Sequence, residues 1–239
     1  MQYKTRGIIL KRTNLGEADR IITIFTEKFG KIRIVARGVR KTLSKMAGHL
    51  EPFCLTNLQI VEGKNLDVVT GAQVEECFMG IRSDLAKTQN CFYIAEIVDK
   101  MTEDGDIHVE IFELLAATFC HADELIAPLL ISFFEINFLA QMGFRPELHQ
   151  CVKCQNKITA GDNSFDFTRG GLICADCGLG RAISDEAIKI IRLSLDHDFS
   201  KIKRIKINKK IEQEIRQLTN YYLKHIHQKD FKSEKYLTK

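Results

Sequence analysis

Residues 21–37 have the sequence IITIFTEKFGKIRIVAR, in which two apolar runs flank a turn at Phe29-Gly30-Lys31. The first run, Ile21–Phe25, is nearly all β-branched, which is typical of a strand buried on both faces. The second run, Lys31–Arg37, alternates, so that Ile32, Ile34 and Ala36 face one way and the basic side chains face the other. These residues predict two strands, of which the second carries a cationic face.

Three further strand-like segments lie in the same part of the chain. They are Tyr3–Lys11, in which Gly7 is the expected position of a bulge, Leu55–Val61 and Leu66–Gln73. Turn residues at 62–65 separate the last two segments. Five short strands within about 75 residues predict a small closed barrel, and the OB-fold is the commonest barrel of that size. We therefore expect an OB-fold domain over residues 1–78.

The net charge of +4 is unevenly distributed along the chain. Residues 1–80 carry 13 basic and 8 acidic side chains (+5), residues 81–150 carry 4 and 12 (−8), and residues 151–239 carry 18 and 11 (+7). The first 45 residues are the most basic part, with 12 basic side chains against 3 acidic ones. Two basic ends around an acidic centre indicate that the blocks meet different partners.

The cationic strand face continues into a basic, turn-rich loop, Gly38-Val-Arg-Lys-Thr-Leu-Ser-Lys45. Strand and loop together form a stripe that suits a nucleic-acid backbone, because lysine and arginine neutralise phosphates. A solvated surface is the ordinary alternative for a charge run, but this run is nearly free of acids. The residues predicted to bind DNA are Lys31, Arg33, Arg37, Arg40, Lys41 and Lys45.

Four of the eight cysteines form two pairs, Cys151-Val-Lys-Cys154 and Cys174-Ala-Asp-Cys177, separated by residues 155–173. This spacing is typical of a four-thiolate zinc site, because each CxxC turn points two sulfurs at a common centre. Four thiolates leave no coordination position for water, so the predicted zinc is structural. The intervening segment predicts a hairpin that turns at Gly170-Gly171. Residues 149–181 are thus the expected zinc-binding module.

Two other uses of these cysteines fit the residues less well. A thioredoxin-like redox site needs one CxxC pair beside a βαβ pattern, and neither condition is met. A zinc deaminase is suggested superficially by His108-Val-Glu110 followed by Cys151-x-x-Cys154. That arrangement leaves the second cysteine pair, Cys174 and Cys177, without a role. We therefore expect no catalytic residues in this chain.

No apolar signal-peptide stretch follows Met1, so we expect a cytoplasmic, nucleoid-associated protein with reduced thiols. The cysteines at 54, 77, 91 and 120 lie singly among apolar residues and are expected to be small buried hydrophobes. The most membrane-like segment is Leu125–Phe144. Because Glu135 and Asn137 interrupt it, a buried helix is favoured over a membrane span.

From Ile81 onward the apolar pattern has a helical period. Two predicted helices have their buried faces at Cys91, Ile94, Ala95 and Val98, and at Ile111, Leu114, Leu115 and Thr118. Residues 129–142 are apolar almost all round, which is typical of a central helix. Ser184 and Asn208 are predicted caps of two later helices, the second with a stripe at Ile211, Ile215, Leu218 and Tyr222. Between them, Lys201–Ile207 is a basic connector that could contact DNA or only solvent.

These segments predict an α+β multidomain protein. Its expected parts are the OB-fold barrel at 1–78, an α-helical domain formed by 79–148 and 182–239, and the four-cysteine zinc module at 149–181 inserted in the helical domain.

The order of the parts and six short motifs resemble the RecO family of bacterial DNA repair proteins, the recombination mediators of the RecFOR pathway. The motifs are Thr5-Arg-Gly-Ile-Ile-Leu10, residues 16–26, Ala36-Arg-Gly-Val-Arg-Lys41, Leu50-Glu-Pro-Phe53, Gly143-Phe-Arg-Pro-Glu-Leu148 running into Cys151-x-x-Cys154, and Gly170-Gly-Leu-Ile-Cys174. Together they span nearly the full length of the chain. One departure is Gln155, which follows the first cysteine pair where the family often has glycine.

The resemblance implies a function and a set of partners. It implies binding of single- and double-stranded DNA, annealing of complementary single strands, and help in loading the RecA recombinase. It also implies partnership with RecR and with single-stranded-DNA-binding protein, while the polar residues within 125–144 already argue against a membrane partner. Two alternatives stay open at this point: a zinc-ribbon scaffold that binds nucleic acid outside repair, and a zinc-dependent deaminase or hydrolase.

Overall fold

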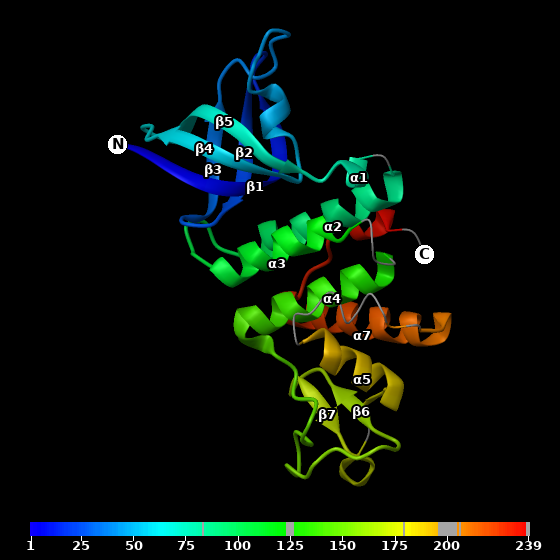
Figure 1. Cartoon of the computed structure of the whole chain (residues 1–239). Helices are drawn as coiled ribbons and strands as arrows, with labels where there is room; N and C mark the ends of the chain where they lie inside the picture. Colours follow the sequence, from blue (N-terminus) through cyan, green and yellow to red (C-terminus); the bar gives the residue numbers. More distant parts are fainter. Residues whose placement is uncertain (83, 123–126, 179, 196–204, 206, 238–239) are drawn as a thin grey trace. The chain divides into compact units, whose positions relative to one another are not determined.

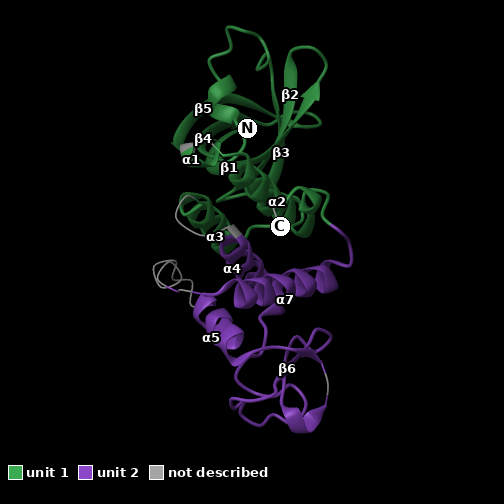
Figure 2. Cartoon of the chain, turned by 90° about the vertical axis from the view of Figure 1, so that its right-hand side faces the viewer, with its two compact units in different colours: residues 1–123, 231–239 green, residues 124–230 purple. Residues whose placement is uncertain are grey.

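The computed structural model describes residues 1–82, 84–122, 127–178, 180–195, 205 and 207–237. It separates the chain into two compact units (Figure 2). Unit 1 comprises Met1–Asp123 and Phe231–Lys239, and unit 2 comprises Glu124–Asp230. The basic connector expected at 201–207 lies almost entirely outside the described residues. The three sequence-based domain limits do not coincide with the two units and stay a prediction.

Five strands form a closed barrel in unit 1, confirming the OB-fold prediction (Figure 1). The strands are β1 (Gln2–Leu15), β2 (Asp19–Thr26), β3 (Gly30–Ala36), β4 (Cys54–Val61) and β5 (Asp67–Cys77). They follow the order β1-β2-β3-β5-β4, and β4 pairs back onto β1. The barrel closes where β3 pairs with β5. This pairing is parallel and short, and it joins Ile34 to Asp67 and Val35 to Val68.

The inside of the barrel is filled by branched apolar side chains. Ile9, Ile22, Ile24, Ile34 and Ile60 are fully buried there, as the alternating pattern requires. The bulge in β1 lies at Leu10, where the register with β2 shifts between Ile9 and Lys11, so its expected position at Gly7 was wrong. The glycine at position 7 serves close packing instead, because a Cβ there would lie 2.5 Å from Cγ2 of Ile24.

The rest of unit 1 is helical. It contains α1 (Met79–Arg82), α2 (Leu85–Met101) and α3 (Val109–Cys120), and the buried faces predicted for the last two are confirmed. The segment Phe231–Leu237 returns to this unit after the whole of unit 2. Phe231 packs edge-on against Tyr93 of α2, with ring centroids 5.7 Å apart. The Glu96 carboxylate accepts hydrogen bonds from the backbone N–H groups of Lys232 and Ser233.

The described residues of unit 2 form α-helices and a small sheet. The helices are α4 (Ala127–Leu139), α5 (Asp185–Ser194) and α7 (Lys209–His227), and the strands are β6 (Ser164–Asp166), β7 (Gly171–Ile173) and β8 (Arg181–Ala182) in the order β7-β6-β8. The predicted caps are confirmed, since Ser184 accepts from the N–H of Ala187 and Asn208 accepts from that of Ile211. The predicted hairpin is confirmed as β6 and β7.

Helix α4 is almost entirely buried, and its two interrupting polar residues have protein partners. The Glu135 carboxylate is fully buried and accepts bonds from Arg216 at 2.9 Å and from the Thr219 hydroxyl at 2.6 Å. The Asn137 amide donates to the carbonyl of Ser194 at 2.9 Å. Buried charges persist in proteins when they are paired in this way. Among the helices that the structure describes, none has both the length and the apolar character needed to cross a bilayer.

The structure corrects the prediction for the four single cysteines. Cys54 and Cys77 form a disulfide, because the β4–β5 register places them directly opposite each other with a Cα–Cα distance of 4.6 Å. Cys91 is buried, as expected, but Cys120 is exposed at the end of α3. Cys54 and Cys77 are 23 residues apart in the chain, and no local pattern connects them.

Candidate metal centre and nucleic-acid interface

The four paired cysteines come together in unit 2. Their sulfur atoms all lie within 4.8 Å of one another, and the Sγ atoms of Cys154 and Cys174 are 3.7 Å apart. A tetrahedral zinc with Zn–S bonds of about 2.3 Å requires S–S separations of about 3.8 Å. The donor set and its spacing therefore fit a metal ion. No histidine, aspartate or glutamate that the structure describes belongs to this group, so the possible ligands are four thiols.

Local backbone geometry points these sulfurs inward. Each CxxC turn forms a knuckle, the first at Cys151–Cys154 and the second at Cys174–Cys177. The first knuckle is closed by the N–H of Gln155, which donates to the carbonyl of Cys151 at 2.8 Å. The N–H groups of Lys153 and Cys174 point at the sulfur of Cys151, at 3.4 and 3.5 Å. Gln155 completes the turn with a φ of 63°, a left-handed conformation that favours glycine. Gly178 follows the second knuckle with a φ of 117°.

The thiols strongly influence one another's ionisation. Burial opposes ionisation of Cys151, but N–H groups of Cys154, Cys174 and Lys153 direct their dipoles at its sulfur and lower its pKa to about 6. At Cys177, the neighbouring Cys154 and Cys174 side chains raise the pKa to about 12. The sulfur of Cys151 is thus ready to carry negative charge, while that of Cys177 resists it. A divalent cation among the four would compensate this concentration of charge.

His108, the residue that suggested a deaminase, is engaged elsewhere. Its Nε2 lies 2.9 Å from a carboxylate oxygen of Asp106 in unit 1. All four cysteines belong to the group in unit 2. The sulfurs of Cys174 and Cys177 therefore lie together with those of Cys151 and Cys154, as the four-thiolate interpretation predicted and the deaminase alternative did not.

The structure removes Lys31 from the predicted DNA-binding stripe. Its side chain is buried, and its ammonium donates to the carbonyl oxygens of Asp99 and Thr102, each at 2.6 Å. The carboxylate of Asp104 lies 3.5 Å away. These contacts join β3 to the end of α2 within unit 1. A buried ammonium with three oxygen partners cannot reach a phosphate.

The other five predicted residues are exposed on the barrel. Arg33 is 58% exposed and forms an ion pair with Asp104 at 2.8 Å. Arg40 donates to the carbonyl of Gly16 at 2.7 Å, and its own N–H donates to the carbonyl of Ala18. The loop begins at Gly38, which has a φ of 63° and donates its N–H to Asp19 at 2.7 Å. The remaining three residues, exposed on or beside this loop, are Arg37, Lys41 and Lys45.

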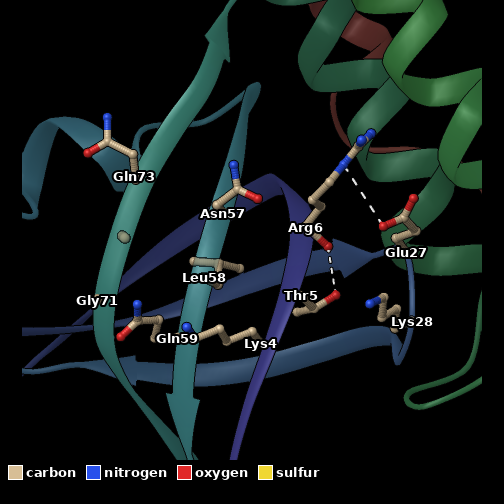
Figure 3. Close-up of a pocket in the computed structure, with 11 residues that line it drawn as sticks. Lys4, Thr5, Arg6, Glu27, Lys28, Asn57, Leu58, Gln59, Gly71 and Gln73 are labelled. Carbon is tan, nitrogen blue, oxygen red and sulfur yellow. Dashed lines mark hydrogen bonds and ion pairs between the residues drawn. The ribbon is translucent and has the colours of Figure 1, made fainter.

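A second cationic feature of the barrel was not predicted. A groove of about 610 Å³ crosses β1, β4 and β5 (Figure 3). Strand register aligns Lys4 with Gln59 and Gly71, and Arg6 with Asn57 and Gln73, while Lys28 lies in the turn after β2. Arg6 is partly neutralised, with Glu27 at 3.9 Å and Glu75 at 3.7 Å from its Nε. These side chains come from four separate segments, so only the strand pairing could have revealed the groove.

Comparison with known proteins identifies the family. The model of the family described as Recombination protein O, N terminal, matches residues 1–78, and that of Recombination protein O, C terminal, matches residues 82–235. The chain belongs to the RecO family. The two matches together cover both the barrel and the four-cysteine group.

Curated members of the RecO family share much of their sequence with this chain. The DNA repair protein RecO of Dehalococcoides mccartyi (strain ATCC BAA-2266 / KCTC 15142 / 195) is 39% identical over 217 residues, which are 89% of this chain and 86% of the relative. That of Roseiflexus sp. (strain RS-1) is 33% identical, over 98% of this chain and 84% of the relative. That of Bacillus pumilus (strain SAFR-032) is 31% identical, over 99% and 94%. Membership of the RecO family implies a role in DNA repair and recombination.

Proposed function

We propose that this protein is a non-enzymatic recombination mediator that binds DNA through its barrel, anneals complementary single strands and assists RecA loading together with RecR. The observation that carries the proposal is the exposed loop after β3. Between Glu27 and Glu51 the chain contains no acidic residue, while Arg37, Arg40 and Lys41 are exposed. An exposed segment that contains several cations and no acid attracts a polyanion and releases its counterions.

We further propose that Cys151, Cys154, Cys174 and Cys177 bind a structural zinc. The S–S distances and the thiol-only donor set support this choice of metal. When bound, zinc would supply a cross-link between the two knuckles. Because four thiolates complete its coordination, the site has no position for an activated water, which argues against the deaminase or hydrolase alternative.

The DNA-binding proposal is tested by the salt dependence of affinity. Arg33, Arg37, Arg40, Lys41 and Lys45 would make five phosphate contacts, so log affinity for a labelled single strand should fall against log salt with a slope of about −3.5. Replacing Arg37, Arg40 and Lys41 together with glutamine should reduce the slope by about 2. The control is Lys64→Gln, at an exposed position in the β4–β5 turn. A slope unchanged by the triple variant would contradict the proposal.

Annealing and the protein partners need separate measurements. Complementary oligonucleotides coated with single-stranded-DNA-binding protein should anneal faster with this protein than without it, and the triple variant should lose most of that gain. Co-purification with RecR and acceleration of RecA filament formation test the remaining steps. Competition with RNA distinguishes a DNA mediator from a general nucleic-acid scaffold, because the scaffold would bind both polymers equally.

A further inference from the structure

Unit 2 carries a cluster of aromatic rings that extends from its core to its surface. Phe165 and Tyr222 form the buried layer, with ring centroids 5.3 Å apart. Phe167 lies next to Phe165 at 5.1 Å and to Tyr221 at 5.6 Å. Tyr221 is 59% exposed, although its neighbour Tyr222 is buried. The buried layer fixes the rings above it, so Tyr221 is held exposed with the partly buried Phe167 next to it.

Polar groups of α7 and a cation of β8 surround the exposed Tyr221 ring. Gln217, Tyr221 and His225 are spaced by four residues and therefore share one face of the helix. The guanidinium of Arg181, on β8, lies 5.2 Å from the centroid of the Tyr221 ring. Its Nη2 also donates to Gln217 at 2.6 Å. A planar cation is thus held over one face of an exposed ring by two separate contacts.

The hairpin adds a second cation close to Phe167. Arg169, two residues further along the chain, is 54% exposed and bonded to Asp166 at 2.9 Å. Asp166 also accepts from the N–H groups of Thr168 and Arg169, which fixes the turn that follows Phe167. The ribbon, which is the sheet of β6, β7 and β8 with the cysteine pairs, therefore positions one ring and both arginines, while α7 positions the other ring.

We propose that Phe167 and Tyr221, with Arg181 and Arg169 beside them, form a stacking platform for the bases of single-stranded DNA, distinct from the barrel loop. Aromatic faces bind bases of any sequence, and adjacent arginines stack on bases and neutralise phosphates. A protein partner is the rival occupant, since exposed aromatic and arginine side chains also anchor protein interfaces. DNA is favoured because the groups around the Tyr221 ring are guanidinium, imidazole and amide, while the carboxylate of Asp166, next to Phe167, is paired with Arg169.

This platform rests on the proposed DNA-binding function and deepens it. Annealing requires that two strands be held by one protein or by its assembly. A barrel loop that acts through charge and a platform that acts through stacking are two contacts of different chemistry. Each belongs to its own unit, so each can be altered separately.

The first experiment uses the absence of tryptophan from the chain. Tyr221→Trp places the only tryptophan of the chain at the platform, where its emission can be excited selectively, and keeps the stacking surface. The matched control is Tyr236→Trp, because Tyr236 is 56% exposed and also has a cation, Lys235, 4.8 Å from its ring centroid. Oligo-dT should quench the fluorescence of Tyr221→Trp, saturating at the concentration at which the anisotropy of labelled oligo-dT saturates. The fluorescence of Tyr236→Trp should stay unchanged.

The second experiment separates stacking from charge. Tyr221→Ala should weaken binding of single strands about tenfold, whereas Tyr221→Phe should retain affinity. The salt slope should be the same in both variants and the parent protein, because no phosphate contact is lost. Bound zinc and the thermal unfolding of Tyr221→Ala should match those of Tyr221→Phe, which excludes a folding defect.

The outcomes distinguish the platform from the barrel. If labelled oligo-dT binds Tyr221→Trp without quenching its fluorescence, the platform proposal is overturned and the barrel proposal stands. If oligo-dT does not bind at all, both fail. Quenching of the same variant by RecR or single-stranded-DNA-binding protein, with none by oligo-dT, would assign the surface to a protein partner instead. Quenching by oligo-U alone would show that the ligand is RNA.

Discussion

The barrel of unit 1 and the cysteine ribbon of unit 2 are both small β structures, but they are stabilised in different ways. The barrel closes on itself and buries a cluster of branched side chains, among them Ile9, Ile24 and Ile60. The ribbon has two strands of three residues and one of two, too little sheet to exclude water from a large core. With the proposed metal, its four sulfurs would add a cross-link to the small core formed by Phe165, Leu172 and Ile173. Hydrophobic burial therefore makes one region independent of ligands, and the proposed metal would make the other dependent on one.

The strongest test of this contrast is removal of one sulfur. Cys174→Ser should abolish zinc binding, lowering the content from about one ion per chain to none, because a structural site needs all four ligands. Hydrogen exchange should then increase across residues 149–181 and stay unchanged in β1–β5. Cys120→Ser, at an exposed cysteine outside the group, is the control. Cooperative unfolding of the barrel in Cys174→Ser would refute the independence of the two regions.

The reciprocal test creates a cavity in the barrel. Ile24→Ala removes a fully buried side chain and should lower the free energy of unfolding of unit 1 by roughly 3 kcal/mol. Denaturant unfolding monitored by circular dichroism measures the loss. Zinc content should be unaffected. Loss of zinc in this variant would mean that the ribbon depends on the barrel.

A third test sharpens the division of roles among the barrel's own cations. Lys31→Met should destabilise unit 1 by about 2 kcal/mol, because the carbonyls of Asp99 and Thr102 lose a buried charged donor. The salt slope for single-strand binding should not change. Lys41→Met should do the opposite, reducing the slope by about 0.7 with little effect on stability. A reduced slope in Lys31→Met would return this residue to the DNA interface.

The smallest expected effect concerns the turn of the first knuckle. Gln155→Gly should stabilise the ribbon by roughly 0.5 kcal/mol, because glycine adopts the observed φ of 63° without strain, a gain that its greater freedom when unfolded only partly offsets. Competition with a chelator would detect this as slightly tighter zinc retention. Gln155→Ala keeps the Cβ and should show no gain. Equal retention in both variants would show that the turn is not strained.

The sequence predicted most of what depends on local pattern. Alternation and turn residues located the five strands, and the spacing of Cys151, Cys154, Cys174 and Cys177 predicted the group that the structure brings together. Ser184 and Asn208 indicated two helix starts, because a capping side chain acts within three residues of its position.

What the sequence did not predict depends on contacts between distant residues. Lys31 fits the alternating pattern of β3, which predicted an exposed side chain. Its hydrogen-bond partners Asp99 and Thr102 lie 68 and 71 residues away in the chain. The Cys54–Cys77 disulfide depends on a register that also contains two irregularities. The surroundings of the exposed Tyr221 ring depend on Arg181 and Phe167, which reach it only through the fold of the ribbon.

The return of Phe231–Leu237 to unit 1 bears on the order of events during synthesis. These residues leave the ribosome after all of unit 2, yet Phe231 packs on Tyr93 and the N–H of Ser233 is bonded to Glu96. The surface of α2 that contacts them therefore stays without these contacts while the whole of Glu124–Asp230 emerges. A nascent chain halted before Phe231 should therefore expose the apolar face of α2 around Tyr93, to which a chaperone can bind. After release from the ribosome, Phe231–Leu237 should cover that face.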